Sequence, residues 1–440
     1  MQPENPEQTP APRGLQGLIA GWLRGSVVRD FLRVMFGHFA GRAGLALSMI
    51  LIARWLPEAE YGKFIIGYGF MMFFANVWSG FYQGLIRQLS ELTGAGEQGR
   101  AEGLFWAAFR FQTLVLTALL VGVLVFAQYV ALGLYGNPEL ATAVRFGALA
   151  GFLAAWTQLF AIHYQTSLRF NRYALILNLR YAVITVGVVA AGVSPWFNLY
   201  VALGLIVVAG LAPAAIAMFD VRRLGRGIER VGLGGRITQI VTEQVLVIIY
   251  FLLIWLGLEI PMMLVSHIEG DLETVGTFGI AWRIFQISFM VLSAVYHVLI
   301  PRLSRDREFA YQRHVFKRWL TWTPVPAALF ALVFWVTMPL VIPWLFAGKY
   351  DAAIPLVQIF GVLIGYNFVL NPLFMLLAQK DFGWLVGCGV WFFLANAVGG
   401  YFLISAFGFI GAGFSVAIAY QSNLIGVVRS WRNIQRRTAA

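Results

Sequence analysis

The segment GTFGIAWRIFQISFMVLSAVYHVLIPRLSR, residues 276–305, decides how this chain folds. It is apolar over a length sufficient to cross a bilayer, it holds one arginine, Arg283, within the apolar run, and it ends in an arginine-rich exit. A membrane-crossing α-helix needs about 20 predominantly apolar residues. The segment therefore predicts a transmembrane helix that carries a charged side chain.

A segment in the first quarter of the chain matches this one at an offset of 214 residues. The matching pairs are Gly62 and Gly276, Phe64 and Phe278, Leu85 and Leu299, Ile86 and Ile300, Leu89 and Leu303, and Ser90 and Ser304. A second set has the same offset: Phe146 and Phe360, Gly147 and Gly361, Leu149 and Leu363, Gly151 and Gly365, and Gln165 and Gln379. The chain is therefore predicted to hold two copies of one membrane unit.

The composition supports a membrane protein. Of 440 residues, 60% are hydrophobic and only 12% are charged, whereas about a quarter of the residues in a soluble domain are charged. With short connections, the length accommodates about twelve crossings. The apolar segments are too long and too uniform for the alternating strands of a membrane barrel. The predicted fold is an all-α integral membrane protein, with about twelve transmembrane helices in two six-helix lobes around a central cavity.

The basic residues predict the orientation. They gather in alternate connections, notably Asp220–Arg236 and Arg302–Arg318, whereas Glu259–Glu273 is interpreted as an outer loop with four acids and no Lys or Arg. Because basic residues favour cytoplasmic loops, both termini are expected in the cytoplasm. The same rule accounts for the net charge of +12 without a nucleic-acid partner. With six crossings in each half, the two copies form a parallel repeat.

These patterns divide the chain into five parts. Residues 1–30 are predicted to be a cytoplasmic segment with an interfacial helix, and residues 31–219 to form the N-lobe with helices 1–6. Residues 220–236 are a glycine- and arginine-rich cytoplasmic linker. Residues 237–428 form the C-lobe with helices 7–12, and residues 429–440 a basic cytoplasmic tail.

Ionisable residues inside the predicted crossings are the candidate substrate-binding groups, because their burial in lipid is costly. Arg42 and Arg283 are expected near the middle of the bilayer, one in each lobe. Arg110 and Arg180 are expected nearer the cytoplasm, and His38 lies one turn before Arg42 on the same face. Guanidinium groups suit phosphate oxygens, so these residues predict an anionic cargo. The alternative is that the arginines only tie helices together through backbone carbonyls.

Glu243 is the one acid that this interpretation places clearly within a crossing. It could bind a proton or Na⁺ that drives transport, or simply form an ion pair with an arginine. The histidines show no metal-ligand spacing, Cys388 is the only cysteine, and no phosphate-binding loop of the GxxxxGK[ST] type is present. No connection is long enough for a membrane glycosyltransferase. We therefore expect that the protein binds no cofactor and has no enzymatic activity.

Four motifs resemble those of Wzx-type oligosaccharide flippases. They are ARWLPEAEYGKF (53–64), VGTFGIAWRIFQI followed by LIPRLSR (275–305), LFAGKYDAAIPLVQIFGVLIG (345–365) and GFIGAGFSVAIAY (408–420). The resemblance implies membership of the multidrug/oligosaccharidyl-lipid/polysaccharide exporter superfamily, with two six-helix lobes that work by alternating access. It also implies an undecaprenyl-pyrophosphate-linked oligosaccharide as cargo, the bacterial inner membrane as location, and a polysaccharide polymerase and glycosyltransferases as partners.

Two other functions stay open at this point. A cation-coupled multidrug exporter of the same architecture would be expected to have acidic residues in its cavity, whereas the charged residues placed at mid-bilayer here are arginines. A scaffold for a polysaccharide assembly complex would need no interior charge at all.

Overall fold

The computed structural model describes residues 26–167, 169–224, 233–286, 309–370, 376, 379 and 381–439. These residues are almost entirely helical and contain no strand. The elements are α2 (Ser26–Trp55), α3 (Glu58–Asn76), α4 (Ser79–Gly94), α5 (Gln98–Tyr135), η1 (Pro138–Leu140), α6 (Ala141–Thr166), α7 (Phe170–Gly192), α8 (Leu199–Leu224), α9 (Leu233–Glu269), a helix over 272–286, α11 (Phe309–Trp322), α12 (Pro324–Phe346), η2 (Asp351–Ala353), α13 (Ile354–Val369), α15 (Phe382–Leu394), η4 (Ala395–Gly399), α16 (Gly400–Phe407), α17 (Phe409–Ala419) and α18 (Gln421–Ala439).

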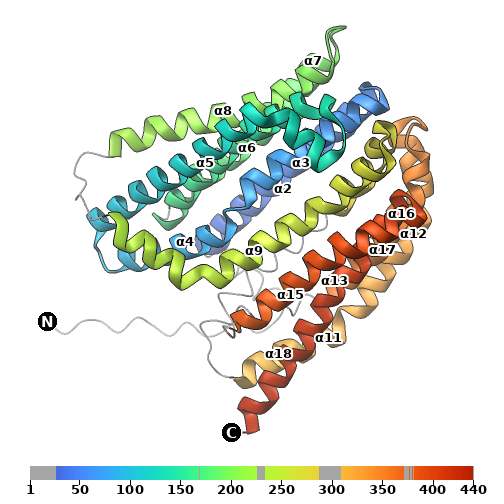
Figure 1. Cartoon of the computed structure of the whole chain (residues 1–440). Coiled ribbons are helices and arrows are strands. Elements are labelled where there is room, and N and C mark those ends of the chain that lie inside the picture. The colour runs from blue at the N-terminus through green and yellow to red at the C-terminus, as the bar shows by residue number, and fades with distance from the viewer. Residues whose placement is uncertain are drawn as a thin grey trace, which may run out of the picture.

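Ten helical stretches in this part of the chain are long and apolar enough to cross a membrane. Figure 1 shows two lobes: α2 to α8 form the first lobe, and the chain from α9 onward forms the second. Helix α9 packs against α3, α4 and α5 on one side and against α15 on the other. Helix α9 is therefore a helix of the second lobe that packs against the first lobe. The predicted two-lobe α-helical membrane fold is confirmed.

Small residues let the helices pack closely inside each lobe. A Cβ atom on Gly147 of α6 would lie 2.2 Å from the Gly67 carbonyl oxygen of α3, and one on Gly151 would lie 2.9 Å from the Met71 oxygen. In lipid, helices associate through such close van der Waals contact, because no hydrophobic effect drives them together. Large apolar side chains such as Leu114, which is 72% exposed, cover the outer surface instead.

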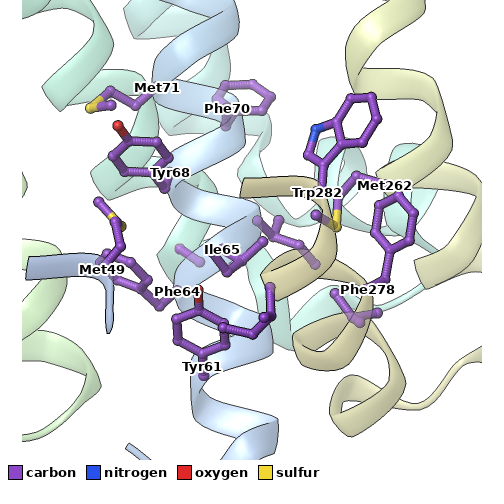
Figure 2. Close-up of a cluster of buried hydrophobic side chains, with 14 of the residues drawn as sticks. Met49, Tyr61, Phe64, Ile65, Tyr68, Phe70, Met71, Met262, Phe278 and Trp282 are labelled. Carbon is purple, nitrogen blue, oxygen red and sulfur yellow. The ribbon is translucent and has the colours of Figure 1, made fainter. Parts of the chain in front are cut away.

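The two lobes meet through the twin glycines of the sequence repeat. A Cβ atom on Gly62 of α3 would lie 2.1 Å from the Leu272 carbonyl oxygen, and one on Gly276 would lie 2.7 Å from the Glu58 oxygen. Residues 58 and 272 are themselves related by the offset of 214. The contact is therefore reciprocal, as a two-fold axis between the halves requires. Figure 2 shows Ile65 of α3 on the side that faces the helix carrying Phe278, and a Cβ atom on Gly279 of that helix would lie 2.8 Å from the Ile65 side chain.

Further contacts between the lobes gather at the same end of the molecule, which we call the acidic end. It is where α2, α5 and α9 terminate, and its acids are Glu58, Glu139, Glu269, Asp271 and Glu273. Lys349 of the second lobe donates to the Arg54 carbonyl oxygen at the end of α2, at 2.8 Å. Ser266 of α9 donates to the Tyr135 oxygen at the end of α5, at 2.9 Å. The opposite end, where the chain turns at 95–97 and 169, is the basic end.

Asp271 fixes the start of the helix that carries Arg283. Its carboxylate accepts hydrogen bonds from the backbone amides of Glu273 and Thr274 and from the Thr274 hydroxyl. Partial burial acts to raise the pKa of this carboxyl, but the three hydrogen bonds lower it overall. Asp271 is therefore a charged N-cap at neutral pH.

One boundary differs from expectation. Glu259–Glu273 was expected to be an outer loop, but α9 continues to Glu269 despite Pro261 within it. The helix ends only at Gly270, whose φ of 69° suits glycine. Glu259 therefore lies inside a crossing helix. The predicted interfacial helix before residue 26 and the middle of the linker, residues 225–232, lie outside the described residues.

The reciprocal glycine contact gives a first prediction. Gly62→Ala or Gly276→Ala would place a methyl group against backbone of the other lobe, so the lobes must separate at the acidic end. An overpacking cost of about 1–3 kcal/mol is enough to shift a two-state equilibrium several-fold or more. Spin labels at Glu139→Cys and Asp351→Cys, in a Cys388→Ser background, would report a longer inter-lobe distance.

Gly133→Ala is the matched control, because nothing lies within 4 Å of a Cβ atom placed there. Unchanged distances in both interface variants would show that this glycine contact does not hold the lobes together.

Candidate functional site

Arg283 projects from the helix 272–286 toward α3, at the contact between the lobes. Its guanidinium lies over the ring of Tyr68, with 4.4 Å between the guanidinium carbon and the ring centroid. Nη1 donates to the side-chain oxygen of Gln286, and Nη2 lies 3.5 Å from the carbonyl oxygen of Ile65. The buried Nε has no hydrogen-bond partner among the residues that the structure describes. An arginine at this contact therefore keeps one N–H group that is not yet used.

A carboxylate lies beside this guanidinium. Glu259 of α9 is only 3% exposed, and no described residue forms a hydrogen bond with its buried Oε1. A Cβ atom on Gly69 of α3 would lie 2.7 Å from Glu259 Oε2 and 3.7 Å from Arg283 Nη2. Both charged groups thus reach over the same glycine, and they interact electrostatically. The absence of a side chain at position 69 is what gives them room.

The depth of these groups is the same along three independent helices. At about 1.5 Å per residue, Tyr68 lies ~15 Å from the start of α3, Glu259 ~15 Å from the end of α9, and Arg283 ~16 Å from residue 272. All three helix ends lie at the acidic end. A hydrocarbon core is about 30 Å thick, so the cluster lies near its middle.

The sequence repeat is broken at this cluster. The offset of 214 pairs Arg283 with Gly69 and Trp282 with Tyr68. Figure 2 shows Tyr68 on α3 and Trp282 on the facing helix of the second lobe. The long charged side chain of one half therefore fills space that glycine leaves in the other.

Arg180 of α7 lies on the other side of Tyr68, inside the first lobe. Its Nη2 is 2.8 Å from the sulfur of Met71, and it interacts electrostatically with Tyr68. It also borders a small cavity, whose lining residues are Leu45, Tyr68, Arg180, Tyr181, Ile184, Ile206 and Ala209. The structure thus brings Arg180 and Arg283 to the same tyrosine. Arg180 lies ~18 Å from the end of α7, deeper than expected from the sequence.

Arg42 has a different neighbourhood. It is half-buried on α2 and interacts electrostatically with Tyr173 of α7. The adjacent Gly41 faces Asn178 and Tyr181, also of α7. Arg42 therefore lies on the side of α2 that meets α7 within the first lobe. His38 lies one turn earlier on α2, and its side chain is outside the described part of the structure.

Arg110 and Glu243 lie away from the cluster. Arg110 of α5 is exposed, and its Nε donates to the Trp106 carbonyl oxygen of the preceding turn. Glu243 of α9 is also exposed and lies 3.8 Å from Arg87 of α4. It is ~39 Å from the end of α9, near the basic end. This position matches the ion-pair alternative for Glu243.

Sequence reasoning missed Glu259 because it ended the crossing near residue 260. The signal was present: the apolar residues 260–265 continue the run, and the first glycine able to stop the helix is Gly270. No cluster of three His, Cys, Asp or Glu side chains suited to a metal ion occurs among the described residues.

Gly69→Ala tests the shared space over this glycine. The added methyl group would displace the Glu259 carboxylate, and we expect a loss of about 1–3 kcal/mol in the free energy of unfolding. Glu259→Ala in the same chain should relieve most of that loss, giving a coupling energy in a double-mutant cycle. Thermal unfolding of the purified protein is the measurement. Gly122→Ala is the control, because a Cβ atom placed there meets no atom within 4 Å. Equal stability of Gly69→Ala and Gly122→Ala would contradict the close approach of Glu259 to Gly69.

Three solved structures show the fold in other proteins. The chain matches a lipid II flippase MurJ in an inward closed conformation, with a TM-score of 0.72 and 14% identity, over 92% of this chain and 87% of that one. It matches an inward-facing multidrug resistance MATE family transporter of the MOP superfamily, with a TM-score of 0.72 and 13% identity, over 89% and 94%. A MOP superfamily transporter from Pyrococcus furiosus, described as having a binding pocket of reverse polarity, gives a TM-score of 0.66 and 12% identity, over 98% and 99%.

No curated protein matches the sequence. A family model described as "Polysaccharide biosynthesis protein" matches residues 27–306, well over half of the chain and including every residue of the Tyr68, Glu259 and Arg283 cluster. The resemblance inferred from the four sequence motifs is confirmed. The chain is a multi-pass membrane protein with the fold of the MOP superfamily, and it belongs to the polysaccharide biosynthesis protein family.

Proposed function

We propose that the protein is a flippase that moves polyprenyl-pyrophosphate-linked oligosaccharides across the bacterial inner membrane by alternating access. The observation that carries this proposal is Arg283, a cation at mid-bilayer depth on the contact between the lobes, whose buried Nε–H has no partner in the described part of the chain. A pyrophosphate has oxygen atoms that can accept the hydrogen bond that this N–H group donates. The polysaccharide biosynthesis family supports an oligosaccharide on the lipid.

The surroundings of Arg283 suggest how a cargo could be exchanged. The guanidinium is held by the Tyr68 ring, which supplies cation–π attraction without using up N–H donors. The carboxylate of Glu259 supplies counter-charge when no anion is present, because an isolated buried cation is costly. An incoming pyrophosphate would compete with Glu259 for Arg283. Its release would restore the pairing between the two residues.

Arg180 and Arg42 are proposed as secondary groups on the path of the anion. Arg180 lies behind Tyr68 and would meet the phosphate after a small movement of that ring, and Arg42, ~20 Å from the end of α2, lies at nearly the same depth as Arg180. We propose that the basic end faces the cytoplasm, where lipid-linked repeat units are assembled, and that the acidic end faces outward. Glycosyltransferases and a polysaccharide polymerase would then act before and after transport.

The test is leaflet transfer of a fluorescent prenyl-pyrophosphate-linked sugar by the reconstituted protein. Arg283→Ala should slow transfer by about 10–100-fold, the value of a charge-assisted hydrogen bond to a buried group. Arg283→Lys should recover part of the rate, because lysine keeps the positive charge but lacks the planar set of N–H donors of a guanidinium. Arg145→Ala removes an exposed arginine of α6 and should leave transfer unchanged. Transfer no faster than in protein-free vesicles would exclude the flippase function.

A cation-coupled multidrug exporter is the second candidate, and Glu259 favours it. A buried carboxylate between the lobes is what a cationic drug or a coupling proton would require. The exporter hypothesis expects a cationic dye to be expelled from vesicles under a pH gradient, and Glu259→Gln to abolish that efflux. The flippase hypothesis expects no dye efflux, and a stronger effect of Arg283→Ala than of Glu259→Gln on transfer of the lipid-linked sugar.

A further inference from the structure

A group of basic side chains gathers at the basic end of the second lobe, where α11 and α18 pack together. Phe316 of α11 stacks on Trp431 of α18, with 5.3 Å between ring centroids, and Lys317 lies over the same tryptophan at 5.9 Å. Figure 1 shows the two helices side by side. We call their exposed basic side chains the basic platform: Arg313, His314, Lys317, Arg318, Arg432 and Arg436.

Within the part of the chain that the structure describes, the platform has no neutralising charge of its own. Neither α11 nor α18 contains an Asp or Glu. The acid that contacts α18, Asp381, accepts hydrogen bonds from Arg429 at 3.0 Å and from Asn433 at 2.9 Å, and both donors lie outside the platform. Within the described residues, no ion pair joins a platform side chain to an acid. The positive charge is therefore available to an external anion.

The first lobe differs at the same end. Three of its arginines at this level lie beside acids: Arg87 is 3.0 Å from Glu91, Arg100 is 2.8 Å from Glu97, and Arg172 is 3.1 Å from Asp220. A general preference for basic residues at this side of a membrane would act on both lobes. Among the described residues, three arginines of the first lobe are thus neutralised by neighbouring acids, whereas no such ion pair involves the platform of the second lobe.

Both platform helices change from apolar to basic along one exposed stripe. On α12 and α11 the stripe runs through Val325 and Trp322 to Arg318. On α18 it runs through Val428 to Arg432 and Arg436, at helical spacing. The platform therefore continues a lipid-facing surface, and its charges begin where the apolar surface ends.

The depth of the change fits a lipid headgroup layer. At about 1.5 Å per residue, Arg318 lies ~42 Å from the acidic end of α12 at Phe346, and Arg436 lies ~41 Å from the start of α17 at Phe409. A bilayer with its headgroup regions is about 40–45 Å thick. Both arginines, reached along separate helices, lie at the level of the far headgroups.

We propose that the basic platform binds the phosphorylated headgroups of anionic lipids in the leaflet at the basic end. The continuity with the lipid-facing surface and the matching depths select a membrane lipid over a soluble polyanion. The second lobe is thereby tied to its leaflet by charge, whereas the first lobe is not. This inference does not depend on the transported cargo.

The test is native mass spectrometry of the intact protein with phosphatidylglycerol and with phosphatidylcholine. Wild-type protein should retain phosphatidylglycerol in preference, and the preference should fall as salt is raised. The triple variant Arg313→Gln, Lys317→Gln, Arg432→Gln should bind phosphatidylglycerol roughly 100-fold more weakly, at about fivefold per basic residue. The single variant Arg436→Gln should bind phosphatidylglycerol about fivefold more weakly. It keeps the proposal testable if the triple variant does not fold.

The matched control removes the same number of charges from the first lobe, with Arg87→Gln, Arg100→Gln and Arg172→Gln. It should keep the wild-type preference, because those arginines are already neutralised. An equal loss in the control, or none in the platform variants, would overturn the proposal. Inorganic phosphate should displace the lipid no better than chloride at equal ionic strength. Stronger displacement by phosphate would reassign the platform to a soluble anion and overturn the lipid assignment.

Discussion

A charge held at mid-bilayer depth is the constraint on which this structure depends. Burying a guanidinium in a low-dielectric medium costs several kcal/mol unless opposite charge and hydrogen-bond partners come with it. Here the partners of Arg283 come from three helices: the ring of Tyr68 and the Ile65 carbonyl from α3, the Glu259 carboxylate from α9, and Gln286 from its own helix. Because α3 belongs to the first lobe, the contacts of Arg283 with Tyr68 and Ile65 exist only while the lobes touch, whereas Glu259 and Gln286 belong to the same lobe as Arg283.

The glycine contacts make that contact close enough. Gly62 and Gly276 allow the backbones of α3 and the facing helix to touch, and Gly69, two turns further along α3, clears the space that Glu259 and Arg283 enter. One face of α3 thus contributes to the structure in two ways. Near the acidic end it brings the lobes together, and at mid-depth it leaves room for polar groups. Separation of the lobes would break the first contact and expose the second to water and cargo.

The two-lobe helical fold could be predicted from the sequence, because length and hydropathy locate the crossings, whereas the orientation taken from the basic loops stays a prediction. The repeat also predicted that Gly62 and Gly276 are equivalent, although not that they touch. Placement around a helix axis was harder. Helix α5 is apolar on all sides, so no periodicity showed that Arg110 would be exposed. Glu259 was missed for another reason: Pro261 and the acids beyond it resemble a loop, although the apolar residues 260–265 continue the run and α9 stays helical to Glu269.

The pairing of Gly69 with Arg283 also limits how such a chain can arise and be rebuilt. Two identical halves around a two-fold axis would place either two arginines or two glycines at the same point. The first arrangement would bring like charges together in a dry interior, and the second would leave a hole with no charge. A symmetric homodimer of either half therefore cannot reproduce this centre. Joining both copies in one polypeptide is what allowed them to become unlike.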